Sequence, residues 1–330
     1  MNAGKFPKLP ARRLIRAVGD RIHAWGKDGG RLCVVSYHRI LKESDIILGA
    51  EPDLATFRWQ IALLAECFNV LPLSEALAAV KEGHLPPRAI SITFDDGYRS
   101  THDLALPVLK EFGLPATVFV TTGYDDGHSM WNDNIIEAIR SMPGKDLDLR
   151  DLGLGMYSLA TPHDRQRTTE KLIASAKYLP SDSRNGLTCR LLDLGRTHGG
   201  DDLMLTRDMI CALARQGVEI GGHTVSHPIL SGLPDDAARK EIVDNKRQLE
   251  EIVGVPIRFF AYPNGKHGID FDQRHADMAR DAGYQAAFAT SIGAITARSD
   301  PYQMPRGRPW DAHPFLFGAR LLLWLAGRTD

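Results

Sequence analysis

The sequence predicts an α/β protein built on a mainly parallel sheet that closes, or nearly closes, into a barrel. Short β-branched, apolar runs alternate with amphipathic segments of helical spacing along most of the 330 residues. Most of the expected helices end at a glycine, the usual residue at a helix C-terminus. Because parallel strands need crossover helices, the alternation predicts repeated β/α units. About seven strands favour a distorted (β/α)7-type barrel over an open sheet.

The expected elements follow one another in a regular order. Buried strands are expected at 31–40, 89–94, 116–122, 218–222, 257–263 and 284–290, with a short last strand at 302–306. Helical spacing predicts helices at 54–67, 73–83, 102–113, 206–217, 235–253 and 272–283. Residues 124–205 interrupt this order, because they are polar and rich in Asp, Arg and Gly. They predict an inserted segment with weak helices.

Composition is that of an ordinary globular protein. Charged residues make up 25% and hydrophobic residues 43%, and the net charge of -1 predicts no nucleic-acid partner. The four cysteines have no CxxC spacing, which argues against a thiolate zinc site and indicates a reducing compartment. No apolar run has the length of a signal-peptide core or a membrane span, so we expect a cytoplasmic protein.

The two ends of the chain differ from the β/α part at 31–310. Residues 1–30 form a basic segment in which Lys and Arg alternate with apolar residues, and 311–330 form an apolar C-terminal helix. A basic amphipathic helix can lie on the anionic cytoplasmic face of a membrane, at its periphery. It can equally pack on the domain and keep a solvated basic face. The sequence leaves both interpretations open.

Two adjacent acids follow a predicted buried strand in "SITFDDG" (91–97). Asp95 and Asp96 repel each other, and each is costly to desolvate unless something compensates its charge. A loop that caps the next helix would explain the pair. A metal held by one acid and a proton handled by the other would also explain it.

Two histidines follow another predicted strand, in "EIGGHTVSH" (219–227). A helical turn would put His223 and His227 on one face, where both imidazoles reach one ion, and Pro228 limits that helix to about one turn. With one carboxylate of the acid pair they form an N, N, O ligand set that leaves positions open for water and substrate. The other carboxylate can then act as general base. We expect a divalent metal, by default Zn²⁺; Co²⁺, Ni²⁺, Mn²⁺ or Fe²⁺ would fit the same ligands.

These two stretches resemble the first two motifs of the polysaccharide deacetylases, carbohydrate esterase family 4, which carry the NodB homology domain. The resemblance covers roughly residues 31–123 and 206–310. It implies the NodB homology fold, a distorted barrel, and the metal-dependent removal of an N-acetyl group from an amino sugar. It also implies the exopolysaccharide-type members as the nearest group.

The resemblance assigns roles to four residues of this chain. The first acid of the TFDDG motif is the catalytic base in the family, so Asp95 is implied as the base. The second acid and the two histidines bind the metal there. Asp96, His223 and His227 are therefore implied as the ligands.

A third stretch, "FFAYPNG", resembles the Tyr-Pro-x-Gly loop of deacetylases that act on bacterial exopolysaccharides. In the family, a backbone N–H of this loop helps to hold the oxyanion. Here the donor would lie at Tyr262 or Asn264, because Pro263 has no N–H.

The chain departs from the chitin and peptidoglycan members at two places. Their arginine that tethers the base is Ala261 here; Arg306 would reach in from the last strand and do the same work, or form an ion pair elsewhere. Their Leu-x-Leu-x-His strand, which ends in the general acid, has no counterpart. Neither His267 nor His313 stands in such a pattern, so the general acid stays unassigned.

Two further residues are candidates for supporting roles. The stretch "VVSYHRI" (34–40) resembles the Tyr-His stretch near the start of the exopolysaccharide deacetylases. We expect His38 to be structural or to support the site, not to bind the metal. Trp131 lies in the inserted segment, and tryptophan often stacks on sugars; the alternative is a packed side chain that anchors the insertion.

The sequence thus predicts a metal-dependent N-deacetylase that acts on an amino sugar of a bacterial polysaccharide or of its lipid-linked precursor. Three alternatives remain. A non-haem iron oxygenase uses the same 2-His-1-carboxylate set, but would leave Asp95 without a role. A hydrolase of small cyclic amides could use the same fold and ligands. A saccharide-binding module with an impaired catalytic set is the third.

Overall fold

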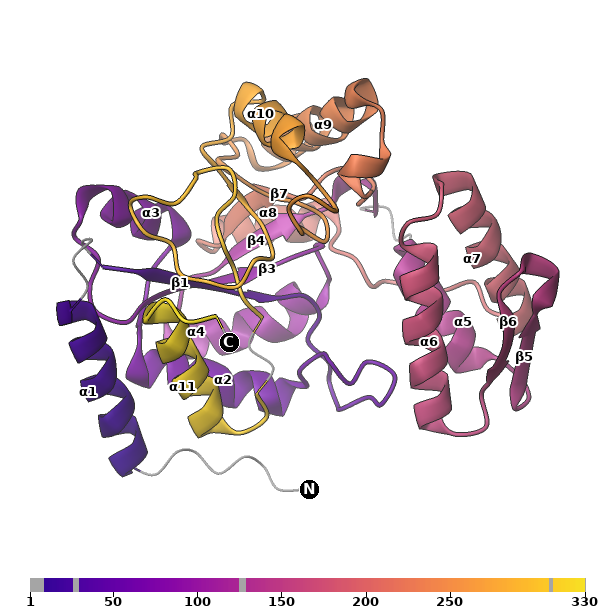
Figure 1. The fold of residues 1–330 in the computed structure, drawn as a ribbon, viewed down its shortest axis with the longest axis horizontal. Helices are drawn as coiled ribbons and strands as arrows, with labels where there is room; N and C mark the ends of the chain where they lie inside the picture. The colour runs from indigo at the N-terminus through magenta and orange to yellow at the C-terminus, as the bar shows by residue number, and fades with distance from the viewer. Residues whose placement is uncertain (1–8, 26–29, 125–128, 309–310, 330) are drawn as a thin grey trace.

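A parallel sheet forms the centre of the protein (Figure 1). The structure is a computed structural model and describes residues 9–25, 30–124, 129–308 and 311–329. In this part of the chain seven strands form one sheet in the order β1-β3-β4-β7-β8-β9, and β2 pairs with the beginning of β3. The strands are β1 (Leu32–Tyr37), β2 (Asn69–Val70), β3 (Ala89–Phe94), β4 (Thr117–Val120), β7 (Glu219–Gly222), β8 (Phe259–Ala261) and β9 (Ala286–Phe288). The predicted parallel α/β class is confirmed.

Crossover helices connect these strands and pack around the sheet. They are α2 (Leu54–Cys67), α3 (Leu73–Glu82), α4 (Leu106–Phe112), α8 (Arg207–Arg215), α9 (Asp235–Val253) and α10 (Gln273–Asp281). A π-helical turn at Thr101–Ala105 leads into α4. Gly83, Gly113 and Gly254 end three of them in the left-handed conformation, with φ between 63° and 72°, which glycine adopts at little cost.

The barrel closes without the predicted last strand. Residues 302–306 form no strand; Met304 makes an isolated bridge to Phe288 of β9, and Gly307 makes one to Val35 of β1. Backbone hydrogen bonds of 2.9–3.0 Å accompany both bridges. A Cβ on Gly307 would lie 2.5 Å from the ring of Trp324, so only glycine fits at this closure.

Alternate residues of each strand enter different apolar clusters, as expected for a strand that is covered on both faces. Val35 and Tyr37 of β1 pack with the surrounding helices, whereas Leu32 and Val34 join a second cluster inside the curled sheet. The second cluster also contains side chains of β4, β8 and β9. The interior is therefore filled, and the catalytic chemistry must lie at an end of the barrel.

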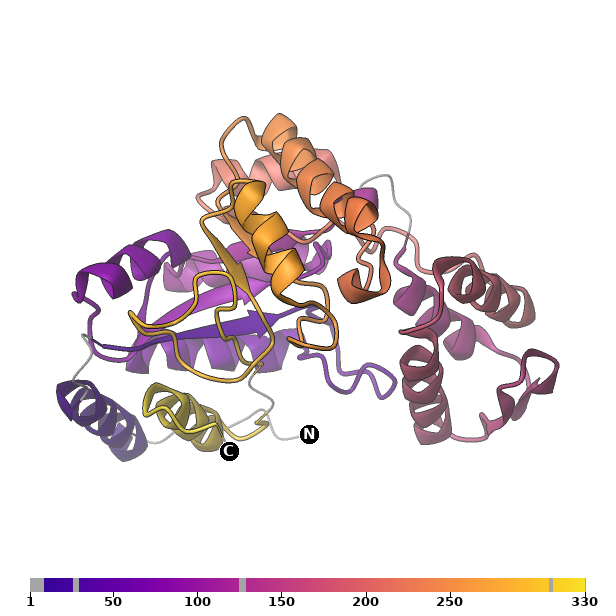
Figure 2. The same cartoon turned by 45° about the horizontal axis from the view of Figure 1, so that its top comes forward.

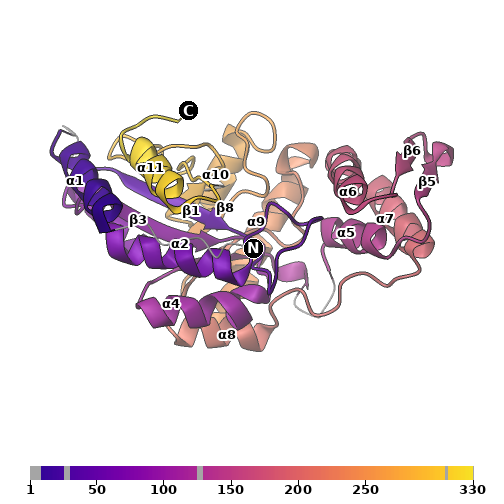
Figure 3. The same ribbon diagram turned by 90° about the horizontal axis from the view of Figure 1, so that it is seen from below.

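The inserted segment forms a separate lobe beside the barrel (Figures 1 and 3). It consists of α5 (Trp131–Ser141), β5 (Asp146–Leu149), β6 (Gly155–Ser158), α6 (Pro162–Ala176) and α7 (Ser181–Gly195). These elements share their own apolar core, to which Ile135, Leu149 and Leu172 contribute buried side chains. The inserted segment thus contains helices, as predicted, and its buried apolar residues meet in this core.

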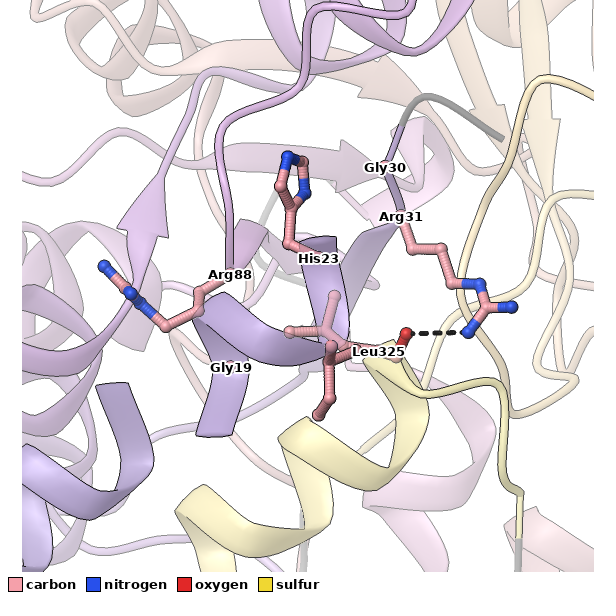
Figure 4. Close-up of a pocket in the computed structure, with 7 residues that line it drawn as sticks. Gly19, His23, Gly30, Arg31, Arg88 and Leu325 are labelled. Atoms are coloured by element: carbon pink, nitrogen blue, oxygen red, sulfur yellow. Dashed lines mark hydrogen bonds between the residues drawn. The ribbon is translucent and has the colours of Figure 1, made fainter. Parts of the chain in front are cut away.

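Helices from both ends of the chain lie side by side against the barrel (Figures 1 and 2). They are α1 (Leu9–Trp25) and α11 (Pro314–Leu325). Phe317 packs edge-on against Trp59 of α2 at 5.5 Å, and Ile15 of α1 is buried beside Gly318. Figure 4 shows Arg31, just before β1, donating to the carbonyl oxygen of Leu325 at 3.1 Å. Neither these helices nor any other described one is long and apolar enough to cross a membrane.

Candidate active site

The two adjacent acids leave the end of β3 in different directions. Asp96 has a left-handed backbone with φ of 71°, and Gly97 follows with φ of 87°. A left-handed aspartate is uncommon and indicates a conformation that the surrounding structure imposes. The turn directs Asp95 toward Arg306 and Asp96 toward the two histidines. The two neighbouring acids therefore have separate partners.

Arg306 and Asp95 form a buried two-pronged ion pair. Nη1 and Nη2 of Arg306 donate to the two carboxylate oxygens of Asp95 at 2.6 and 2.8 Å. The guanidinium lies 5.2 Å from the ring of Phe119 and donates its Nε–H to the carbonyl of Ala289. Burial alone would raise the pKa of Asp95, but the Arg306 charge, with smaller contributions from His223 and His38, holds it below its usual value.

Asp96, His223 and His227 bring one ligand atom each to a common point. Oδ1 of Asp96 lies 3.2 Å from Nε2 of His223 and 3.3 Å from Nε2 of His227. This oxygen is buried and has no hydrogen-bond partner among the described residues. An unsatisfied buried carboxylate oxygen between two imidazole nitrogens is the arrangement expected of a metal site.

The protonation states of the side chains in this cluster also suit a bound cation. Nδ1 of His223 lies 2.7 Å from the carbonyl oxygen of Ala261, which can only accept, so Nδ1 carries the proton and Nε2 keeps its lone pair. Burial lowers the pKa of His227 to about 4, so its imidazole is neutral at pH 7. Burial would raise the pKa of Asp96, but the neighbouring histidines hold it well below its usual value. The residues present therefore fit a divalent metal.

The histidine loop reaches the site without a helical turn, the one geometry considered from the sequence. Residues 223–229 form no helix, and Thr224 and His227 both have left-handed backbones, with φ of 66° and 54°. These two residues, just before Pro228, bring the imidazole rings to a centroid distance of 5.0 Å. The two side chains therefore converge through another backbone path.

Two side chains of α9 hold this loop, and sequence reasoning missed both. Asn245 is fully buried; its Oδ1 accepts from the backbone N–H of His223 at 2.9 Å, and its Nδ2 donates to the carbonyl of Thr224. Glu241, one turn earlier on the same face, accepts from the N–H groups of Val225 and Ser226, both at 2.8 Å. The only signal in the sequence was their i, i+4 spacing, which places both side chains on one face of the predicted helix.

The loop after β8 offers one candidate oxyanion donor. The N–H of Tyr262 already donates to the carbonyl of Phe288 at 3.1 Å, and its hydroxyl donates to the carbonyl of Tyr302. Tyr262 is thus a core residue. Pro263 has no N–H, whereas the N–H of Asn264 has no acceptor among the described residues. Asn264 has a left-handed backbone with φ of 59°.

His38 lies at the mouth of the site, directly after β1. Its Nε2 is 4.0 Å from Oδ2 of Asp95, and the side chain is 33% exposed. The two histidines to which the sequence assigned no role have other contacts: His267 packs on Phe271, and His313 caps α11 by accepting from the N–H of Phe315.

The inserted lobe meets the barrel next to the site. Trp131 packs inside the lobe with the guanidinium of Arg184 at 5.1 Å over its ring, which matches an anchoring role and not an open stacking surface. Asp133, two residues on, is buried and accepts from the hydroxyl of Tyr98 at 3.1 Å. Burial raises the pKa of Asp133 to about 7.

Comparison with known proteins agrees with this site. Residues 82–287 match the family model described as polysaccharide deacetylase. A Bacillus subtilis protein described as a polysaccharide deacetylase, YxkH, is 22% identical over 88% of this chain and 76% of its own length. The poly-β-1,6-N-acetyl-D-glucosamine N-deacetylase of Staphylococcus epidermidis is 29% identical over 31% of this chain and 40% of that protein.

Solved structures share the fold. The deacetylase PplD of Streptococcus pyogenes, in complex with acetate, has a TM-score of 0.60 at 18% identity over 89% of this chain and 98% of that one. IcaB of Ammonifex degensii has a TM-score of 0.58 at 19% identity over 91% of this chain and 99% of that one. The chain belongs to the polysaccharide deacetylase family.

Proposed function

We propose that this protein is a metal-dependent N-deacetylase that hydrolyses the N-acetyl group of an amino sugar in a bacterial polysaccharide or its lipid-linked precursor. The observation that carries the proposal is the pair of neighbouring acids with separate partners. Oδ1 of Asp96 has no hydrogen-bond partner among the described residues and lies beside two histidines. Asp95 forms a buried ion pair with an arginine. Membership of the deacetylase family supports the same reaction.

In this proposal Asp96, His223 and His227 hold the metal, by default Zn²⁺. A divalent cation there would act as a Lewis acid toward the amide oxygen and lower the pKa of the attacking water. The neutral imidazole of His227, the ionised carboxylate of Asp96 and Nε2 of His223, whose Nδ1 donates to the carbonyl of Ala261, provide the lone pairs that this requires.

Asp95 is the proposed general base. It is ionised at neutral pH, because Arg306 outweighs the effect of burial, and it takes the proton of the attacking water. Arg306 positions the carboxylate through both of its oxygens and does not touch the substrate. The N–H of Asn264, which has no acceptor among the described residues, is the proposed donor to the negative charge that develops on the amide oxygen.

His38 is the proposed general acid that protonates the leaving amine. Its imidazole lies beside Asp95 and is not one of the proposed metal ligands. Its partial exposure leaves it accessible to a substrate. Protonation is needed because an amine leaves far more readily than its anion.

The substrate class follows from the named relatives. They include poly-β-1,6-N-acetyl-D-glucosamine N-deacetylases, so we propose a β-1,6-linked N-acetylglucosamine chain as the first candidate. The test is acetate release from β-1,6- and β-1,4-linked N-acetylglucosamine oligomers, with metal-stripped and zinc-reloaded protein. Release that returns with the metal supports the proposal. Opening of a small cyclic imide without acetate release would favour the cyclic-amide alternative, and saccharide binding without hydrolysis would indicate a binding module.

A further inference from the structure

An exposed apolar groove runs between α1 and α11, away from the catalytic site. It has a volume of about 500 Å³ and is lined by Leu14, Ile15, Val18, Ile22, Phe315, Ala319, Leu322, Leu323, Ala326 and Arg328. Leu14 is 53% exposed, and Leu316, which follows Phe315, is 54% exposed. Large exposed apolar side chains that gather on one face indicate a binding surface.

The groove is not a part of the core left open by chance. The inner face of α1 is already buried through Ile15, and the inner face of α11 through Phe317 and Leu321. Gly318 lets the two helices approach closely, because a Cβ there would lie 2.7 Å from Ile15. The outward apolar side chains therefore form a second face that the domain itself does not use.

Positive charge accompanies this face. Leu14, Val18 and Arg21 are spaced by four and three residues, so they share one side of α1. None of the residues that line the groove is acidic, and its one charged side chain is Arg328. Asp20, the acid of α1, is paired with Arg88. The first 25 residues contain six Lys or Arg and one acid, although the whole chain has a net charge of -1.

We propose that this α1/α11 face docks the protein on the surface of an anionic lipid bilayer. The apolar side chains enter the boundary between headgroups and acyl chains, and the arginines contact the lipid phosphates. Both helices lie in the plane of the membrane, since no described helix can span it. The inference is independent of the reaction proposed for the catalytic site.

Basic residues favour a lipid surface over a second copy of this chain. A symmetric contact would bring Arg21 and Arg328 of two copies near each other, and no residue that lines the groove is acidic. An anionic bilayer instead offers a continuous layer of negative charge and an apolar interior. Binding is therefore expected to weaken as ionic strength rises, because part of it is electrostatic.

The test is sedimentation of the full chain with vesicles of phosphatidylcholine alone and with vesicles that also contain anionic phosphatidylglycerol. We expect binding to the anionic vesicles only. Leu14→Asp with Leu323→Asp should lower the partition coefficient by about tenfold or more, because charge replaces apolar burial. Arg21→Glu with Arg328→Glu should lower it to a similar extent, because Arg21 shares the side of Leu14 and Val18 and Arg328 lines the groove.

Met156→Asp with Val255→Asp is the matched control. These residues are 59% and 57% exposed and lie on the inserted lobe and after α9, so this variant should bind as the wild type does. Melting temperatures report whether each variant is folded. Three results would overturn the proposal: no binding of wild type to anionic vesicles, equal losses in the control, or a wild-type dimer that the Leu14 and Leu323 substitutions dissociate.

Discussion

Arg306 donates to both carboxylate oxygens of Asp95, 211 residues away in sequence, at 2.6 and 2.8 Å. Both side chains are almost fully buried. The pair stands where Met304 and Gly307 close the barrel, so barrel closure and the ionisation of the proposed base depend on one segment. A charge placed in this way keeps a buried acid deprotonated.

Replacing Arg306 by Gln is expected to move the acid limb of kcat/KM to higher pH by about one unit or more. The reason is that burial, which raises the pKa of Asp95, is then no longer outweighed by the guanidinium. The measurement is the pH profile of acetate release, with the metal content determined at each pH.

Arg306→Lys is the matched variant, because it keeps the charge and loses only the two-pronged geometry. Its acid limb should stay closer to that of the wild type. Superimposable acid limbs in wild type and Arg306→Gln would contradict the proposed role. Loss of the buried pair is also expected to lower the free energy of unfolding by about 3–5 kcal/mol, so the profiles should be measured well below the melting temperature.

Asp133 should make the stability of the protein depend on pH. Burial raises its folded pKa to about 7, above the usual unfolded value of about 3.9. Its contribution is therefore fully present below pH 4 and is lost as the pH rises through 7. The difference in unfolding free energy between wild type and Asp133→Asn should fall by up to about 1.4 kcal/mol per pH unit in this window. Denaturant titrations at pH 4–8 measure it, and a difference that does not vary with pH would refute the prediction.

The anchors of the histidine loop on α9 should control metal affinity. Asn245→Ala leaves the N–H of His223 and the carbonyl of Thr224 without the side chain that bonds them, which should cost about 1–3 kcal/mol of unfolding free energy. Metal affinity should fall about 10–100-fold, as for other residues that support ligands. Competition with a chromophoric chelator measures this affinity.

Glu241→Ala should also lower the metal affinity, because it removes the acceptor of the N–H groups of Val225 and Ser226. Glu251→Ala is the control on the same helix: Glu251 is exposed and pairs only with Arg247 among the described residues. If the Asn245→Ala and Glu241→Ala variants bound zinc as tightly as the Glu251→Ala control, α9 would not support the histidine loop.

Much of the fold was predictable, because its signals are local. Strands such as 89–94 and helices such as 235–253 appear at their expected places, and the acid and histidine stretches stand directly after strands. Parallel strands bring such ends to one edge of a sheet, so the meeting of Asp96 with His223 and His227 followed from order alone.

The support of the histidine loop and the role of Arg306 depend on long-range contacts that cannot be inferred from the sequence. Asn245 and Glu241 look like ordinary polar residues of a helix until the loop is seen against them. Left-handed residues at Thr224 and His227 shape the histidine loop in place of a helical turn, and side chains of α9 hydrogen-bond its backbone. For Arg306 the sequence left two roles open, a tether for Asp95 or an ion pair elsewhere, because the position of its side chain depends on how the barrel closes.

Bound zinc and acetate release, measured together in Asp95→Asn and Asp96→Asn, distinguish the roles of the two acids. We expect Asp95→Asn to keep about one zinc per chain and to lose activity by about 10²–10⁴-fold, as for a missing general base. Asp96→Asn should lose the zinc and the activity together. Zinc lost from Asp95→Asn but retained by Asp96→Asn would reverse the two proposed roles.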